Sequence, residues 1–225
     1  LRVYAHVLAY AKSKGLLVIA DAKRGDIGST AEAYADAHLG HVVVGSAEER
    51  IFQADALTVN PYLGWDSVDP FIETAKEHGA GIFVLVKTSN PSSADFQDVR
   101  CGDKRLYEIV AENVATWGKD LMGESGYSSV GAVVGATFPQ EAAALRKLMP
   151  KAYFLVPGYG AQGATAKDVA PCFNPDGLGA IVNASRSIIF AHQSPAWRDK
   201  HPEADWHRAV EDAVYKMNEE LRAVR

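Results

Sequence analysis

One short stretch of the sequence places a lysine between two carboxylates. It reads Asp21-Ala22-Lys23-Arg24-Gly25-Asp26 and directly follows the apolar run 16–20. Side chains alternate along a strand, so Asp21 and Lys23 are expected to point to the same side. Neighbouring carboxylates favour the charged form of a lysine, so the pattern predicts an ammonium group placed to act as an acid. A surface cluster of ion pairs at a strand end would give the same spacing, and the charges alone leave both interpretations open.

Two later segments have the composition of anion-binding loops. Residues 157–163 read PGYGAQG, and residues 183–187 read NASRS. Glycines let backbone N–H groups approach a phosphate closely, and the Arg186 guanidinium can direct two donors onto it. Barrels that bind phosphate hold it in the loops after their last two strands. Turn glycines and a solvated arginine are the alternative, but two such loops in these places favour a phosphate site.

The elements that must position these residues alternate between short apolar runs and amphipathic stretches, as in β/α units. Capping-box patterns predict helices that begin near Ser29, Ser46 and Thr137, and residues 205–225 are predicted to form a closing amphipathic helix. No linker or low-complexity segment divides the chain, so residues 1–225 are expected to form a single domain. Strands are predicted at 16–20, 54–59, 81–86, 130–134, 153–156 and 179–182.

Each predicted strand leads into polar or glycine-rich residues, and this arrangement decides between two fold classes. Polar groups at the end of every strand suit a TIM (β/α)8 barrel, in which all strand ends converge on one mouth. A doubly wound sheet would gather them at one crevice, and no Gly-x-Gly-x-x-Gly follows the first strand. The chain also opens within a helix. We therefore expect an α/β barrel with six of its eight β/α units visible, the first two lying outside this sequence.

The bulk composition narrows the classes of function. The chain has 225 residues, of which 48% are hydrophobic and 23% charged, as is usual for a globular protein. A formal net charge of −5 argues against nucleic acid as the main partner, and no apolar run is long enough to span a membrane. Neither the two cysteines nor the seven histidines have metal-binding spacing, so we expect no metal and two reduced thiols in a cytoplasmic protein.

Several motifs in this order resemble those of the orotidine 5′-phosphate decarboxylase family. Residues 21–28 read DAKRGDIG, which is similar to the pattern of a bacterial subgroup. The resemblance covers residues 1–191 and includes LTVNPYLG (57–64), KTSNP (87–91), VVGAT (133–137), the 157–163 loop and SRSI (185–188). It implies a cofactor-free barrel enzyme of pyrimidine biosynthesis that converts orotidine 5′-monophosphate to UMP and carbon dioxide, working as a homodimer with shared active sites.

The resemblance also implies roles for the charged stretch. Lys23 resembles the lysine that donates a proton to C6 of the pyrimidine, and Asp21 resembles the aspartate placed against the substrate carboxylate. Asp26 resembles a second aspartate of the charge array, which reaches across the dimer interface together with Ile27 and Thr30. Decarboxylation leaves electron density on a ring carbon without an electron sink, so a fixed cation near that carbon suits the chemistry.

The remaining implied contacts hold the nucleotide. Ser89 is similar to the serine that contacts the pyrimidine ring, and Gln162 to the glutamine that bridges towards the base and the phosphate. The phosphate itself is expected against Gly160, Ser185 and Arg186. Because the phosphate is remote from the bond that breaks, its binding can drive loop closure and orientation.

Two other functions stay open on the sequence alone. Sugar-phosphate decarboxylases and aldolases of the same barrel group use Mg²⁺ and share the Asp-x-Lys-x-x-Asp spacing, but Ser89 and Gln162 favour a pyrimidine nucleotide. The second alternative is a catalytically incomplete binding module, because the family also uses an aspartate on its first strand and a lysine on its second. The retention of Lys23 with both of its aspartates argues against such decay.

Overall fold

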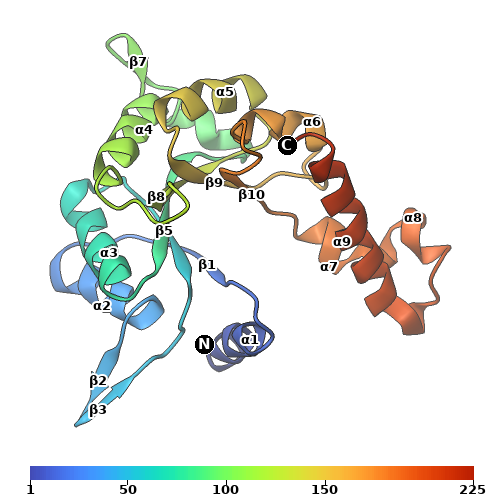
Figure 1. The fold of residues 1–225 in the computed structure, drawn as a ribbon, viewed down its shortest axis with the longest axis horizontal. Coiled ribbons are helices and arrows are strands. Elements are labelled where there is room, and N and C mark those ends of the chain that lie inside the picture. The colour runs from blue at the N-terminus through green and yellow to red at the C-terminus, as the bar shows by residue number, and fades with distance from the viewer.

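A curled, six-stranded parallel sheet organises the structure, a computed structural model that describes residues 1–225. The sheet forms a half-barrel (Figure 1), because each connection carries the chain back over the same outer face before the next strand begins. Its strands, in spatial order, are β1 (Ile19–Arg24), β4 (Ala56–Val59), β5 (Gly81–Lys87), β8 (Ser128–Val134), β9 (Ala152–Val156) and β10 (Ala180–Val182).

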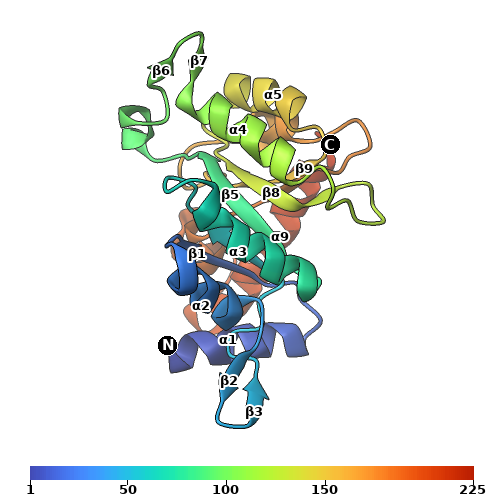
Figure 2. The same cartoon turned by 90° about the vertical axis from the view of Figure 1, so that its left-hand side faces the viewer.

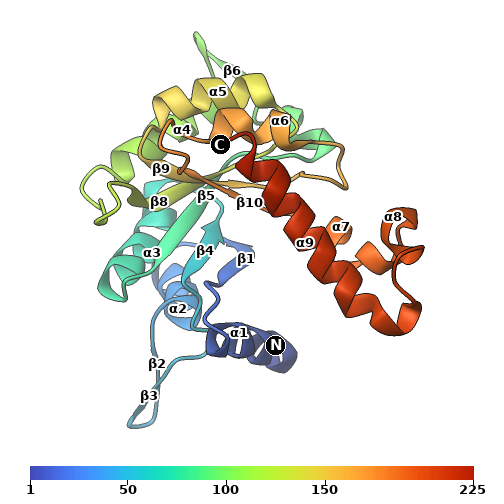
Figure 3. The same cartoon turned by 45° about the vertical axis from the view of Figure 1, so that its right-hand side comes forward.

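Helices cover the convex face of this sheet (Figures 2 and 3). They are α2 (Gly28–His38), α3 (Trp65–Glu77), α4 (Leu106–Trp117), α5 (Pro139–Leu148) and the short α6 (Ala166–Val169). α1 (Arg2–Ser13) precedes the first strand, whereas α7 (Arg186–Ile189), α8 (Pro195–Arg198) and α9 (Trp206–Arg222) extend away from the β10 side of the sheet (Figure 1). The predicted closing helix is thus confirmed. No helix combines the length and the apolar character needed to cross a bilayer.

Short elements lie in the connections. β2 (Val42–Val44) and β3 (Ala47–Glu49) form one antiparallel hairpin, and β6 (Arg100–Cys101) and β7 (Lys104–Arg105) form another. The 3-10 turns are η1 (Pro91–Asp95), η2 (Ala170–Cys172), η3 (Ala191–Gln193) and η4 (Glu203–Asp205).

Strand side chains form two cores, one on each face of the sheet. The larger core lies between the sheet and its helices and includes Leu57, Val84 and Phe154, which are fully buried. Successive strand residues point to opposite faces, so the neighbouring positions form a smaller core on the concave side. Helices outside and a packed interior are the arrangement of a β/α barrel, and the expected fold class is confirmed with six β/α units. The smaller core contains Ala56, Phe83, Val133 and Leu155.

The first strand lies further along the chain than predicted. It begins at Ile19 and continues to Arg24, whereas the apolar run predicted a strand over 16–20. Leu16 and Leu17 are 61% and 85% exposed, so the interpretation of the whole run as a buried strand was wrong. The hydrophobic run predicted the approximate position of the strand, but pairing with β4 decides where it begins and ends.

The helix predicted near Ser46 is instead the β2–β3 hairpin. Three consecutive valines favour extended backbone, and Gly45, with φ +66°, supplies the left-handed conformation that the tight turn requires. Helices do begin close to Ser29 and Thr137, but neither side chain caps them, so the capping interpretation was wrong in detail.

Candidate active site

A cavity of about 580 Å³ opens at the carboxyl ends of the strands. Its floor consists of apolar side chains from the concave face of the sheet: Ile19, Leu85, Val133, Leu155 and Ile181. Polar side chains from the strand ends surround this floor, among them Asp21, Lys23, Thr88, Ser89, Gln162 and Asn183. An apolar pocket of this size with a few convergent polar groups is the usual form of a small-molecule site.

Asp21 and Lys23 form a pair at the edge of this cavity. The Lys23 ammonium donates to Asp21 Oδ1 over 2.6 Å, and both side chains remain about half exposed, at 49% and 60%. Thr58, which is fully buried in β4, lies beneath them. Its hydroxyl donates to Asp21 Oδ1 over 3.0 Å and accepts from the Lys23 backbone N–H over 2.9 Å. One buried hydroxyl therefore fixes both members of the pair.

The backbone of Lys23 is in an unusual conformation for a side chain of its kind. Its φ is +49°, in the left-handed region. The strand pairing is also irregular here, because Ala20 pairs with Leu57 but Arg24 already pairs with Val59. Such bulges near active sites redirect side chains, and this one carries Lys23 into the cavity while Arg24 rejoins the ladder.

This conformation is not maintained by the ion pair that it creates. A non-glycine residue in the left-handed region costs about 1–3 kcal/mol. An ion pair as exposed as Asp21–Lys23 returns only about 0–1 kcal/mol. The ion pair alone does not offset the strain, and residues strained in this way cluster at functional sites.

Ser89 and Gln162 both line the cavity and lie close to Gly158. Gly158, with φ +105°, separates them: a Cβ placed there would lie 3.2 Å from Gln162 Oε1 and 3.4 Å from the Ser89 Cβ. Gly135 confines Ser89 from below, because its own Cβ would lie 3.0 Å from the Ser89 Cα. Two glycines thus leave room for the serine and the glutamine at the rim.

The other expected phosphate contacts lie outside this cavity. Gly160 borders a second cavity of about 640 Å³ between the 157–163 loop and α9. Ser185 precedes α7, and Arg186 is its first residue; both are exposed, and the Arg186 guanidinium forms no ion pair with a carboxylate of this chain. The structure therefore brings Gln162 to the first cavity but leaves Gly160, Ser185 and Arg186 around it.

Asp26, Ile27 and Thr30 also lie apart from the cavity. They occupy the turn after β1 and the first turn of α2, where Ile27 is 55% exposed and Thr30 is exposed. The Asp26 carboxylate accepts from the Ile27 backbone N–H over 2.9 Å. Of the charged stretch, only Asp21 and Lys23 line the site within one chain.

The structure adds residues that the sequence interpretation did not single out. Thr58 has the clearest role. The feature of the sequence that could have indicated it is a hydroxyl at a concave-face position of an apolar strand.

Behind the site, the Lys87 ammonium donates to Asp98 and holds the pKa of that carboxyl below its usual value. Burial, followed by a hydrogen bond to Glu220, raises the pKa of Tyr159 beside the second cavity. No group of three or more His, Cys, Asp or Glu side chains is arranged to hold a metal ion.

Comparison with known proteins gives a consistent result. The family model described as "Orotidine 5'-phosphate decarboxylase / HUMPS family" matches residues 4–197. The chain is 48% identical over 216 residues to the orotidine 5′-phosphate decarboxylase of Rhodopirellula baltica, covering 96% of the chain and 70% of the relative. It is 51% identical over 185 residues to the enzyme of the same name from Caldicellulosiruptor bescii, covering 82% and 61%. The chain thus spans between three fifths and three quarters of the length of these relatives.

A solved structure extends the likeness to the fold. The Leishmania donovani OMP decarboxylase superimposes with a TM-score of 0.75 at 33% sequence identity. The match covers 98% of this chain and 73% of that one. The likeness therefore includes all six strands and the strand-end loops that form the cavity.

Proposed function

Because the chain belongs to the orotidine 5′-phosphate decarboxylase / HUMPS family, we propose that its cavity binds orotidine 5′-monophosphate and releases carbon dioxide to leave UMP. The family membership rests on a match across most of the chain. The proposed activity rests on one observation above all: a strained backbone holds Lys23 beside Asp21 at the edge of the cavity.

Lys23 supplies the charge that this reaction needs. When the bond between C6 and the carboxylate breaks, its electron pair stays on C6, and the nearby ammonium stabilises that negative charge. An N–H of Lys23 then gives its proton to C6, and the neutral amine regains a proton from solvent. Asp21 orients the ammonium through the 2.6 Å bond and places a second negative charge beside the departing carboxylate.

The nucleotide is held at both ends. Ser89 meets the pyrimidine ring at the cavity rim, and Gln162 reaches from the glycine-bearing loop towards the base and phosphate. Gly160, Ser185 and Arg186 receive the phosphate when their loops close over it. The exposed guanidinium of Arg186, which pairs with no carboxylate of the chain, is available for that role.

A second copy of the chain completes the site in this proposal. Asp26 is half-buried and Ile27 and Thr30 are exposed just beyond β1, and none of the three side chains lines the cavity of its own chain. We place them at the interface of a homodimer, where each copy lends them to the other's cavity.

The experiment combines a binding and a turnover measurement. We expect the chain to bind UMP in calorimetry and the full-length protein to convert orotidine 5′-monophosphate in excess EDTA. Lys23→Ala is expected to abolish turnover while UMP binding largely survives, because the phosphate contacts remain. Lys119→Ala is the control, since Lys119 is an exposed lysine remote from the cavity.

Each alternative gives a different result. Activity lost in EDTA would indicate the Mg²⁺-dependent chemistry of the related sugar-phosphate enzymes. UMP binding without any turnover by the full-length protein would indicate a binding module. Near-normal turnover by Lys23→Ala would show that another group donates the proton.

A further inference from the structure

Lys87 is a buried lysine to which the proposed reaction assigns no role. Only 1% of its side chain is exposed, at the carboxyl end of β5. Its ammonium lies 2.7 Å from Asp98 Oδ1 and 4.5 Å from the centre of the Phe138 ring, with the Tyr107 ring at 5.3 Å. A lysine is almost never buried unless it is paired, because removing its charge from water is costly. Here Asp98 and the two aromatic rings compensate for that cost.

A bulge in β5 turns Lys87 away from the cavity. Leu85 pairs with Val133 and points into the cavity, so regular alternation would point Lys87 there too. The register shifts between Leu85 and Lys87, and Lys87 pairs with Val134 instead. Its side chain consequently lies behind the site, against Tyr107 of α4, and not among the lining residues.

The sequence neighbours of Lys87 and Asp98 form a second link. The Thr88 backbone N–H donates to Gln97 Oε1 over 2.9 Å, and Gln97 Nε2 donates to the Thr88 hydroxyl over 2.8 Å. Thr88 follows Lys87, and Gln97 precedes Asp98. Residues 87–88 at the end of β5 are therefore bonded to residues 97–98. We call these four residues, Lys87, Thr88, Gln97 and Asp98, the loop clamp.

The loop clamp closes the base of the segment that carries Ser89 and Asn90 into the cavity. The Thr88 hydroxyl also donates to Asn90 Oδ1 over 2.6 Å, which extends the network to the rim. On the opposite side, the Gly135 N–H donates to the Lys87 carbonyl over 2.7 Å and leaves no space for Ser89 to shift towards it. Ser89 is thus fixed from both sides before any ligand arrives.

We infer that the loop clamp is a positioning device that presents Ser89 and Asn90 to the base of the nucleotide, with Lys87 as its buried anchor. The inference rests on the proposed function, since it takes the ligand in the cavity to be a pyrimidine nucleotide. Holding the segment in its bound conformation reduces the ordering cost of binding, and an ion pair shielded from solvent is screened less by salt than an exposed one.

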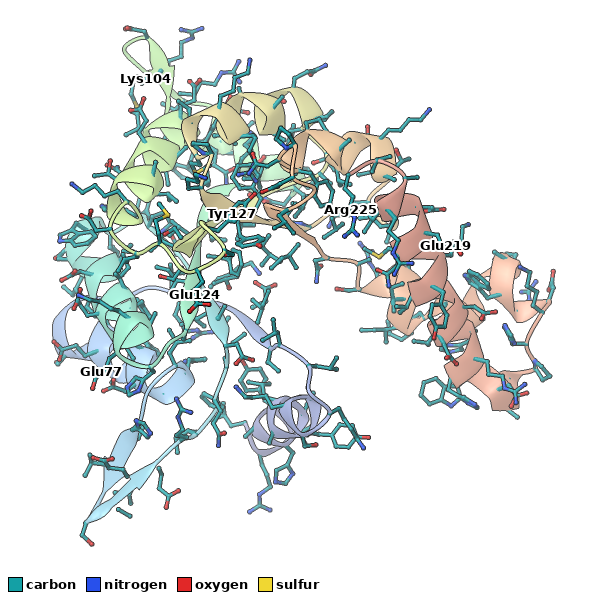
Figure 4. All side chains as sticks on the ribbon, in the orientation of Figure 1. Glu77, Lys104, Glu124, Tyr127, Glu219 and Arg225 are labelled. Atoms are coloured by element: carbon teal, nitrogen blue, oxygen red, sulfur yellow. The ribbon has the colours of Figure 1, made fainter.

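The test compares clamp variants of the full chain with a matched control. Lys87→Met and Asp98→Asn each break the ion pair. Lys104→Met breaks the exposed Lys104–Glu112 pair in the same connection between β5 and β8, and Lys104 lies at the tip of the β6–β7 hairpin, away from the sheet (Figure 4). Gln97→Leu removes both bonds to Thr88 while leaving the buried ion pair intact, which guards against misfolding of the other variants.

Two ligands separate positioning from stability. UMP carries the base, whereas ribose 5-phosphate lacks it and meets only the phosphate contacts. We expect the clamp variants to weaken UMP binding by about tenfold, as for one hydrogen bond lost, and to leave ribose 5-phosphate affinity nearly unchanged. Lys104→Met should change neither. Amide hydrogen exchange of residues 88–98 should accelerate in the clamp variants, while the amides of β8 stay protected.

The contrary results are distinct. Equal losses for both ligands, or unchanged UMP affinity despite faster exchange, would show that the clamp serves only the stability of the fold. If the wild-type chain bound no UMP, the proposed function would fail. Amide exchange would then decide alone, and unchanged protection of residues 88–98 in Lys87→Met would overturn the clamp itself.

Discussion

Replacing Thr58 with valine isolates the hydroxyl that organises the Asp21–Lys23 pair. The two side chains have nearly the same shape, so the fully buried site loses two hydrogen bonds without acquiring a large cavity. Asp21 then retains only its bond from the Lys23 ammonium and can rotate with it. The Lys23 backbone N–H loses its partner in a conformation that is already strained.

The size of the effect follows from the two bonds. A bond to a charged carboxylate contributes about 1.5–3 kcal/mol, and one between neutral groups about 0.5–1.5 kcal/mol. We therefore expect Thr58→Val to lower the free energy of unfolding by about 2–4 kcal/mol. If only the bond to Asp21 stabilises the transition state, losing its contribution of about 1.5–3 kcal/mol predicts a roughly ten- to hundredfold fall in kcat.

The assay pairs urea unfolding with steady-state decarboxylation at a temperature where every variant is folded. Thr58→Ser keeps the hydroxyl and loses a methyl group, so it should recover most of kcat while remaining somewhat destabilised. A Thr58→Val protein with the expected loss of stability but wild-type kcat would refute the reasoning. Orientation of Asp21 would then contribute nothing to the reaction.

Three further predictions concern the scaffold. Arg146→Met should destabilise the chain by about 4 kcal/mol in urea unfolding. The buried guanidinium makes five hydrogen bonds to backbone carbonyls, and methionine would leave these carbonyls without a donor. Gly135→Ala should weaken UMP binding in calorimetry by about tenfold, since the added Cβ would push against Ser89. Unchanged affinity would show that Ser89 can shift without loss of binding. Burial lowers the pKa of His38, so the unfolded chain takes up the proton first and stability should fall as pH drops below about 6.5. His38→Gln should flatten that part of the urea-midpoint profile between pH 7.5 and 5.5, and an identical slope would assign it to other groups.

The sequence was sufficient for the class of fold because the apolar runs are short, regularly spaced and followed by polar residues. Five of the six predicted strands overlap their observed positions almost completely. The first differs because Asp21 and Lys23 belong to the strand itself, and pairing with β4 outweighs their polarity. The hairpin at 42–49 was missed because a local capping pattern near Ser46 competed with a run of valines that only extended backbone accommodates well.

The site was predictable where its residues are neighbours in sequence. Alternation along one strand placed Asp21 and Lys23 together, and motif order placed Ser89 and Gln162 at strand ends. Thr58 was not predictable as a partner, because its contact with Asp21 spans 37 residues and depends on strand register. The irregular pairing at Lys23 was equally hidden, since no local rule forces a lysine into the left-handed region.

Two lysines, one in the cavity and one behind it, form similar ion pairs in different environments. Lys23 and Lys87 each contact one aspartate oxygen, over 2.6 and 2.7 Å, but the first is half exposed and the second is buried. An exposed pair contributes little to stability, so the contact of Lys23 with Asp21 can change during the reaction at small cost to the fold. Breaking a buried pair leaves an uncompensated charge and is strongly unfavourable, so Lys87 stays fixed. The reaction uses the lysine that faces the cavity, and a precise rim uses the lysine that is buried behind it. A buried Lys23 or an exposed Lys87 would therefore impair proton transfer or the positioning of the cavity rim, respectively.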